Sequence, residues 1–108
     1  MAVATDRARE MEVFAAVAAG GSFSAAGRTL GLTPSAVSRT VDRIEARLGV
    51  RLMLRTTRAL VLTAEGQAYL AAARRILADL DDAEQGVAEE VFQHDGGIAE
   101  FADHRHDR

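Results

Sequence analysis

Only three residues, Gly31-Leu32-Thr33, separate two segments that each have the pattern of a short helix. The first segment, residues 25–30, follows Ser22, whose hydroxyl can cap a helix. The second segment opens at Pro34, and proline suits the first position of a helix. Two helices joined by a three- or four-residue turn that contains Gly form a helix-turn-helix unit. This spacing constrains the fold more than any other feature of the sequence.

The flanking segments predict the rest of a small domain. Residues 5–19 carry apolar side chains at intervals of three and four, which predicts a first helix. These side chains are Met11, Phe14, Val17 and Ala18. The β-leaning runs 50–54 and 59–62 flank a polar segment and predict a hairpin with Arg55 and Arg58 at its tip. We therefore expect a mainly α fold, a winged helix-turn-helix with a three-helix core and a short β-hairpin wing.

A long helix is predicted after the hairpin, capped by Thr63 and covering residues 64–91. Apolar residues spaced alternately by four and three form a heptad seam along it, typical of helices that pair. The seam residues are Tyr69, Ala73, Ile76, Leu80, Ala83 and Val87. We expect them to form a dimer interface, because the other elements already supply a core; the alternative is a helix packed on its own domain.

These elements divide the chain into three parts. Residues 1–63 are expected to form the winged helix-turn-helix, with the helix-turn-helix at about 23–42 and the wing at about 50–62. Residues 64–91 are the predicted dimerisation helix. Residues 92–108 lose the helical period and contain Gly96-Gly97, which predicts a flexible acidic tail.

The formal net charge of −3 hides a strong asymmetry along the chain. Residues 1–78 hold 11 arginines against 6 acids, whereas residues 79–108 hold 2 arginines against 10 acids. The positive half favours a nucleic-acid partner, which the overall charge alone would argue against.

The segment from Pro34 to Leu48 forms an amphipathic helix with a distinctive outer face. Its predicted core stripe is Val37, Val41, Ile44 and Leu48. Its outer pole holds Ser35, Arg39, Asp42 and Ala46, with Ser38 beside it. Small polar groups let the start of a helix enter a major groove, where Ser and Arg can bond to bases and phosphates. Solvated helix surface is the plainer interpretation of the same residues.

The segment FSAAGRTLGLTPSAVSRTVDRIEARLGVRLMLRTTRALVLTAEG resembles the DNA-binding region of LysR-type transcriptional regulators. The resemblance spans roughly residues 9–88 and follows the family's order of motifs. These are F-S-A-A, P-S-A-V-S-R, L-G, R-T-T-R and L-T-x-x-G. Thr40, Met53 and Ile44 depart from the family, which often has Gln, Phe and Leu there. The family's effector-binding region is not present in these 108 residues.

The resemblance implies that the third helix reads DNA, that the wing touches its backbone and that the long helix dimerises the domain. Together with the helix pattern, it gives a set of predicted DNA-binding residues: Ser24, Thr33, Pro34, Ser35, Ser38, Arg39, Arg43, Arg55, Thr57 and Arg58. Arg43 and Arg47 have a competing interpretation as partners of acids such as Asp42 and Glu45. Glu45 itself is predicted to be a structural ion-pair partner.

The expected function is sequence-specific binding of double-stranded DNA by a dimer, or a higher oligomer built from it, on a roughly palindromic site. The alternative is an interaction protein whose long helix pairs with a full-length regulator and inhibits it. We expect a cytoplasmic, nucleoid-associated protein with no membrane contact, because no apolar run approaches the length of about 20 residues that crosses a bilayer.

Several other functions find no support in the sequence. An enzyme is not expected, because no nucleophile has a base at a defined spacing and so small a domain has little room for a concave site. No cofactor and no effector site are expected in this chain. There is no cysteine. His94, His104 and His106 stand in the predicted tail without a helix to fix their spacing, so no metal site is expected.

Overall fold

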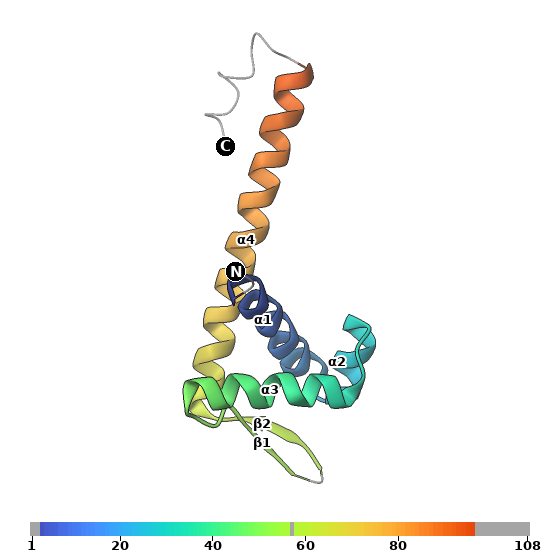
Figure 1. Ribbon diagram of the computed structural model, residues 1–108, viewed down its shortest axis with the longest axis vertical. Helices are drawn as coiled ribbons and strands as arrows, with labels where there is room; N and C mark the ends of the chain where they lie inside the picture. Colours follow the sequence, from blue (N-terminus) through green and yellow to red (C-terminus); the bar gives the residue numbers. More distant parts are fainter. Residues whose placement is uncertain (1–2, 57, 97–108) are drawn as a thin grey trace. The chain divides into compact units, whose positions relative to one another are not determined.

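The computed structural model describes residues 3–56 and 58–96, and the side chains of residues 7–56 and 58–89. Three helices, a two-stranded antiparallel hairpin and a fourth helix follow one another along the chain (Figure 1). The elements are α1 (Val3–Gly20), α2 (Phe23–Leu30), α3 (Pro34–Leu48), β1 (Met53–Arg55), β2 (Leu60–Leu62) and α4 (Ala64–Gly96). The predicted mainly helical winged helix-turn-helix is confirmed.

Short local signals fix the two helices of the helix-turn-helix. Ser22 Oγ accepts the N–H of Ala25 at 3.0 Å, so α2 begins at Phe23, two residues earlier than the helical pattern indicated. Gly31 ends α2 with a positive φ of 72°, a conformation that glycine adopts without steric cost. Gly49 ends α3 in the same way, with a φ of 72°.

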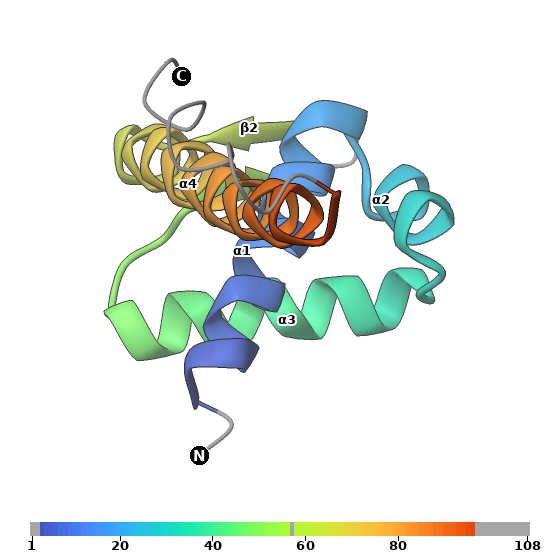
Figure 2. The same ribbon diagram turned by 90° about the horizontal axis from the view of Figure 1, so that it is seen from above.

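The core of the N-terminal unit lies where α1, α2 and α3 meet, and the hairpin packs against it through Leu60 and Leu62 (Figures 1 and 2). Its buried members come from α1, α2, α3 and the start of the wing: Val13, Phe14, Val17, Ala26, Val37, Val41, Ile44, Leu52 and Met53. The expected core stripe of α3 is correct for three residues but wrong for Leu48, which is 46% exposed. Leu48 is the last residue of α3, so no further turn of this helix covers it.

The hairpin is shorter than the sequence suggested. Met53 pairs with Leu62, Leu54 with Val61 and Arg55 with Leu60. The N–H of Leu52 is bonded to the Glu45 carboxylate instead of a neighbouring strand. Regular strand pairing begins at Met53, although the Leu52 carbonyl still accepts the N–H of Thr63 at 3.0 Å. Glu45 thus attaches the base of the wing to α3.

Two glycines are required by close approaches of the backbone. A Cβ on Gly27 would collide with the Leu32 carbonyl oxygen, and a Cβ on Gly66 with that of Leu52. Gly27 lets α2 lie against the turn that follows it. Gly66 lets the first turn of α4 lie against the start of the wing.

The chain divides into two compact units, residues 1–77 and 78–108. The first unit includes the beginning of α4, because Tyr69 packs edge-on against Phe14, with ring centroids 5.0 Å apart, and Ala73 is fully buried. This division lies beyond the domain limit expected at residue 63. The heptad seam is therefore only partly available to a partner, since its first two residues are covered within the chain.

Helix α4 runs to Gly96, further than the end expected at residue 91. No Gly or Pro stands between Val87 and Gly96 to interrupt it. The predicted flexible tail is therefore helical over residues 92–96, and the rest of it, with His104 and His106, lies outside the described residues. Within the described part of the chain, no helix combines the length and apolar character needed to cross a membrane.

Candidate nucleic-acid interface

The amino-terminal end of α3 is an exposed surface of small side chains. Thr33 caps the helix, its Oγ1 accepting the N–H of Ala36 at 3.1 Å, and Pro34 follows at the start. Ser35 is exposed and Ser38 is partly exposed. The helix dipole gives this end a partial positive charge, which favours a nearby phosphate. Small outward side chains allow the backbone here to approach a groove closely.

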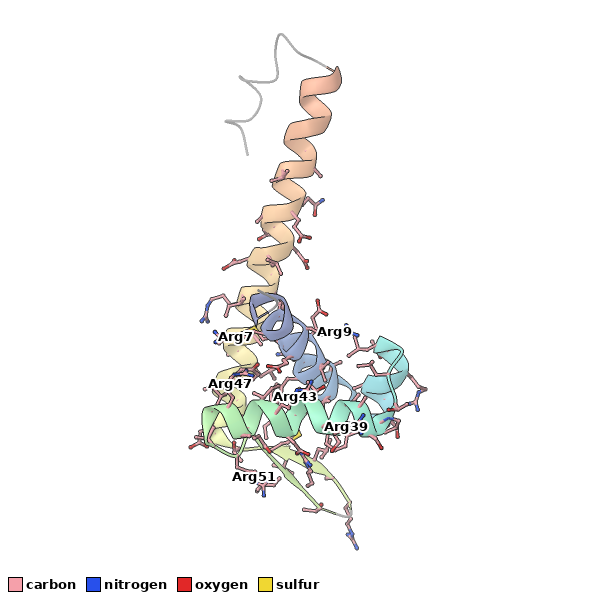
Figure 3. All side chains as sticks on the ribbon, in the orientation of Figure 1. Arg7, Arg9, Arg39, Arg43, Arg47 and Arg51 are labelled. Atoms are coloured by element: carbon pink, nitrogen blue, oxygen red, sulfur yellow. The ribbon has the colours of Figure 1, made fainter. Side chains whose placement is uncertain are left out.

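Arg39, Arg43 and Arg47 follow one another along α3 at intervals of one turn (Figure 3), but their charges are not equally available. Arg47 Nη1 lies 2.8 Å from Glu10 Oε1, and Arg43 Nε lies 3.8 Å from Glu10 Oε2. Arg43 also donates to Thr40 Oγ1 at 3.2 Å. Arg39 is exposed and has no ion pair within the described residues. Arg39 is thus the arginine of α3 whose charge is free to meet a phosphate or a base.

Glu10 of α1 is the acid that holds Arg43 and Arg47, where the sequence suggested Asp42 and Glu45. Its side chain is only 9% exposed. The contact between Arg47 and Oε1 is an ion pair without the alignment of a hydrogen bond, because Oε1 has no hydrogen-bond partner. Tyr69 lies in the same region, and burial raises the pKa of its hydroxyl above the usual value. Arg47 opposes this rise and Glu10 adds to it. A buried acid on α1 thus orients the basic side of α3.

The wing is fastened to α3 through Glu45. Its Oε2 accepts the N–H of Leu52 at 2.8 Å and that of Met53 at 3.3 Å, and Arg51 Nη1 lies 3.5 Å from Oε1. The predicted structural role of Glu45 is confirmed.

Arg55 does not lie at the tip of the hairpin, as the sequence suggested. It is the last residue of β1, paired with Leu60, and its guanidinium lies against α3 and α2. The β1 strand ends one residue later than the apolar run predicted, which moves Arg55 out of the connecting loop. Arg58 lies in the connection and is exposed. Thr57 lies outside the described residues.

A shallow groove of about 410 Å³ brings the predicted residues of three elements together. Ser24 at the start of α2, Pro34 at the start of α3 and Arg58 of the wing all line it. Arg55 and Phe23 form part of its wall. The groove therefore joins two helix starts and a basic wing, an arrangement that suits a phosphate backbone.

Three of the arginines between residues 28 and 58, namely Arg28, Arg39 and Arg58, are exposed and form no ion pair within the described part of the chain. They lie on α2, on α3 and on the wing. The other arginines between residues 28 and 58 are compensated by Glu10, Asp42 or Glu45. Within residues 28–58, the positive charge available to a ligand therefore comes from these three arginines, and Arg58 lines the groove. Among the described residues, no three His, Asp or Glu side chains come together as a metal site.

This fold, with two helices joined by a short turn, a groove between their starts and an arginine-bearing wing, defines a winged helix-turn-helix domain of the DNA-binding class. Residues 8–67 match the family described as "Bacterial regulatory helix-turn-helix protein, lysR family". The chain belongs to the LysR family.

Relatives of known name support this membership. The chain is 51% identical over 75 residues to the HTH-type transcriptional regulator CrgA of Neisseria meningitidis serogroup B (strain ATCC BAA-335 / MC58). It is 42% identical over 77 residues to the HTH-type transcriptional activator AaeR of Escherichia coli (strain K12). These matches cover 69% and 71% of the chain but only 25% of each relative. The chain thus spans about a quarter of their length. These relatives are transcriptional regulators and not enzymes.

Solved DNA complexes share the architecture. The structure of a CbnR_DBD–DNA complex matches with a TM-score of 0.66 and 37% identity, covering 75% of this chain and 97% of that one. The structure of a BenM_DBD/catB site 1 DNA complex matches with a TM-score of 0.76 and 26% identity, covering 81% of this chain and 94% of that one. The predicted family and its DNA-binding fold are confirmed.

Two features of the site were missed by reasoning from the sequence. Glu10 was not singled out, although it lies three residues before Val13 and four before Phe14, on the face that α1 buries. An acid on a predicted core face indicates a partner of opposite charge, and that signal was available. The contact between Arg55 and Phe23 had no local signal, because 32 positions separate the two residues.

Proposed function

We propose that this chain binds specific sites in double-stranded DNA as a dimer, with α3 in the major groove and the wing beside it. The observation that carries this proposal is the start of α3, where small exposed side chains and the unpaired Arg39 occupy one surface. Both DNA complexes named above belong to proteins with this architecture, which supports the proposal. Binding to DNA places the protein in the cytoplasm, at the nucleoid.

The proposed contacts fall into two groups. Ser35, Ser38 and Arg39 would read base edges, because they lie on the outer face of α3 and Arg can donate two bonds to guanine. The residues that line the groove or cap α3 would hold phosphates and fix the register of the domain. This second group is Ser24, Thr33, Pro34 and Arg58. Thr57, which lies outside the described residues, is proposed as a phosphate contact from the resemblance of the wing motif alone. Arg43 contributes less, because Glu10 and Thr40 already engage it.

The dimer proposal rests on the uncovered part of the α4 seam. Ile76 is 42% exposed, Leu80 43% and Val87 64%, and Ala83 is also exposed. Tyr69 and Ala73 are used within the chain and contribute less than the sequence indicated. Large apolar side chains in a row on one helix are stabilised when a second copy covers them.

The order of residues along α4 favours a second copy that runs in the opposite direction. Ile76 and Leu80 stand two positions on either side of Ala78. In an antiparallel pair centred on Ala78, each Ile76 would therefore meet the Leu80 of the other copy. The other residues of the seam are spaced symmetrically about the same point, since Ala73 and Ala83 each stand five positions from Ala78, and Tyr69 and Val87 each stand nine. In this register the apolar stripe of one copy therefore runs along the apolar stripe of the other.

An engineered disulfide tests this arrangement, because the chain has no cysteine of its own. The double variant Ile76→Cys, Leu80→Cys should form a disulfide-linked dimer on oxidation, since the two positions meet across the antiparallel pair. Ile76→Cys alone is the control and should stay unlinked, since it would face Leu80 of the other copy. Non-reducing electrophoresis measures both effects. Efficient linkage by Ile76→Cys alone would contradict the antiparallel register.

An alternative partner for the same stripe is a full-length regulator, which this chain would inhibit by forming a mixed dimer. The exposed Ile76 and Leu80 support either partner. Mixing the chain with a full-length paralogue separates the two proposals. A preference for mixed over identical pairs would favour the inhibitor.

Selection of bound duplexes from a random pool tests DNA binding itself. We expect the full chain to enrich a roughly palindromic sequence, because a symmetric dimer presents two equivalent α3 helices. Recovery of an unenriched pool would remove the proposal of specific binding.

A further inference from the structure

We propose that Arg55 is a positioning residue for DNA recognition. In this inference it holds the wing against α3 and neutralises Asp42, and it does not itself contact a phosphate. The inference rests on the proposed reading of DNA by α3. It replaces the role that the sequence suggested for this arginine.

The guanidinium of Arg55 joins three elements of the first unit. Its Nη2 donates to Asp42 Oδ1 at 2.8 Å and lies 3.8 Å from Glu45 Oε1, both on α3. Its Nη1 makes a long contact of 3.5 Å with Ser38 Oγ. Its central carbon lies 5.1 Å from the centre of the Phe23 ring on α2. One side chain of β1 is thus held by a carboxylate pair, a hydroxyl and an aromatic face.

These contacts leave little of Arg55 for a ligand. Its side chain is 29% exposed, and an acid, a hydroxyl and a ring already engage the parts that would bind a phosphate. Arg58, three positions later, is exposed and has no ion pair within the described residues. Arg55 and Arg58 therefore have different environments, although they belong to one short motif. Arg58 is free to contact a phosphate, whereas the guanidinium of Arg55 is held in place by its neighbours.

Asp42 is the acid on α3 whose charge Arg55 neutralises. It stands on the outer face of α3 with its side chain 56% exposed, next to the serines and Arg39 proposed to face DNA. An unpaired carboxylate there would repel the phosphates that α3 approaches. Pairing with Arg55 removes that repulsion and, because Ser38 Oγ is also contacted, restrains a residue proposed to read bases.

The test compares Arg55→Ala, Asp42→Asn and the double variant in the full chain, on a duplex selected from the random pool. Arg55→Ala should bind about tenfold more weakly, since it frees the wing and exposes Asp42. The double variant, which removes both charges, should recover several-fold of that loss. For the double variant, the slope of log affinity against log salt concentration should match wild type, because the net charge is unchanged. Arg58→Ala is the control, and it should reduce that slope by about one per protomer.

The opposite pattern would overturn the inference. If Arg55 contacted a phosphate, the double variant would lose salt dependence as Arg58→Ala does, and it would recover nothing. If Arg55→Ala does not fold, Arg55→Lys takes its place in the test, because lysine keeps the positive charge but lacks the planar guanidinium. Positioning predicts a clear loss of affinity for this variant, and phosphate contact predicts near-retention. A wild-type chain that enriches no sequence would instead refute the proposed function.

Discussion

Glu45 on α3 accepts the backbone N–H of Leu52 at 2.8 Å, so a buried carboxylate attaches the base of the wing to this helix. The same oxygen accepts the N–H of Met53 at 3.3 Å. Both amides belong to core residues, which are 1% and 0% exposed, and would otherwise be buried without a partner. The base of the wing is therefore attached to α3 by this side chain, while Arg55 holds the end of β1.

Glu45→Ala should lower the free energy of unfolding by about 1–3 kcal/mol, the cost of leaving a buried amide unsatisfied. Urea denaturation measures the loss. Glu65→Ala, at an exposed acid of α4, is the control and should stay within about 0.5 kcal/mol of wild type. Equal stability of the two variants would show that water satisfies these amides and that Glu45 is dispensable.

Gly66→Ala should destabilise the domain, although the same change at an open helical position stabilises by up to about 1 kcal/mol. The new Cβ would collide with the Leu52 carbonyl oxygen, and accommodating such an overlap typically costs about 1–3 kcal/mol. Thermal unfolding of this variant and of Gln67→Ala, an exposed neighbour, checks the sign. A rise in melting temperature for Gly66→Ala would mean that α4 does not approach the wing this closely.

Local signals in the sequence predicted the bounds of α3 well, but they predicted the hairpin register and the place of Arg55 poorly. The bounds of α3 follow from Thr33, Pro34 and Gly49, because capping groups, a helix-starting proline and a C-terminal glycine act within one turn. The place of Arg55 could not be obtained in this way, since it depends on hairpin register and on Asp42, 13 positions away. The covering of Tyr69 and Ala73 is likewise tertiary: a heptad pattern marks an apolar stripe but does not say what packs on it.

The salt dependence of DNA binding should reflect the arginines that remain unpaired. Arg28 and Arg58 of each protomer would contact phosphates, and Arg39 would bring a third unpaired positive charge close to the backbone. A dimer would then neutralise the equivalent of about six phosphates, and affinity should fall about 10³-fold between 50 and 200 mM salt. Fluorescence anisotropy across this range measures it. A flat response would exclude nucleic acid, and a fall near 10⁵-fold would show that the paired arginines also reach phosphates.

Leu80→Asp should convert the dimer to monomers without unfolding the first unit. Leu80 is 43% exposed in a single chain, so the change costs little there, but it would place an unpaired charge in the proposed contact. Light scattering measures mass, circular dichroism measures helix content, and affinity for the selected site should fall at least tenfold. Gln85→Asp adds the same charge on the opposite side of α4 and should remain dimeric. A Leu80→Asp variant that stayed dimeric would place the interface elsewhere.

The most direct test of the account is the ratio of affinities for the selected site and for random duplex DNA, measured for wild type, Arg39→Ala and Arg58→Ala. If α3 reads bases through Arg39, its removal should reduce that ratio by about 1–3 kcal/mol, roughly 5- to 150-fold. Arg58→Ala should weaken both affinities nearly equally and leave the ratio unchanged. An Arg39→Ala variant that kept the wild-type ratio would contradict base recognition by Arg39 at the start of α3.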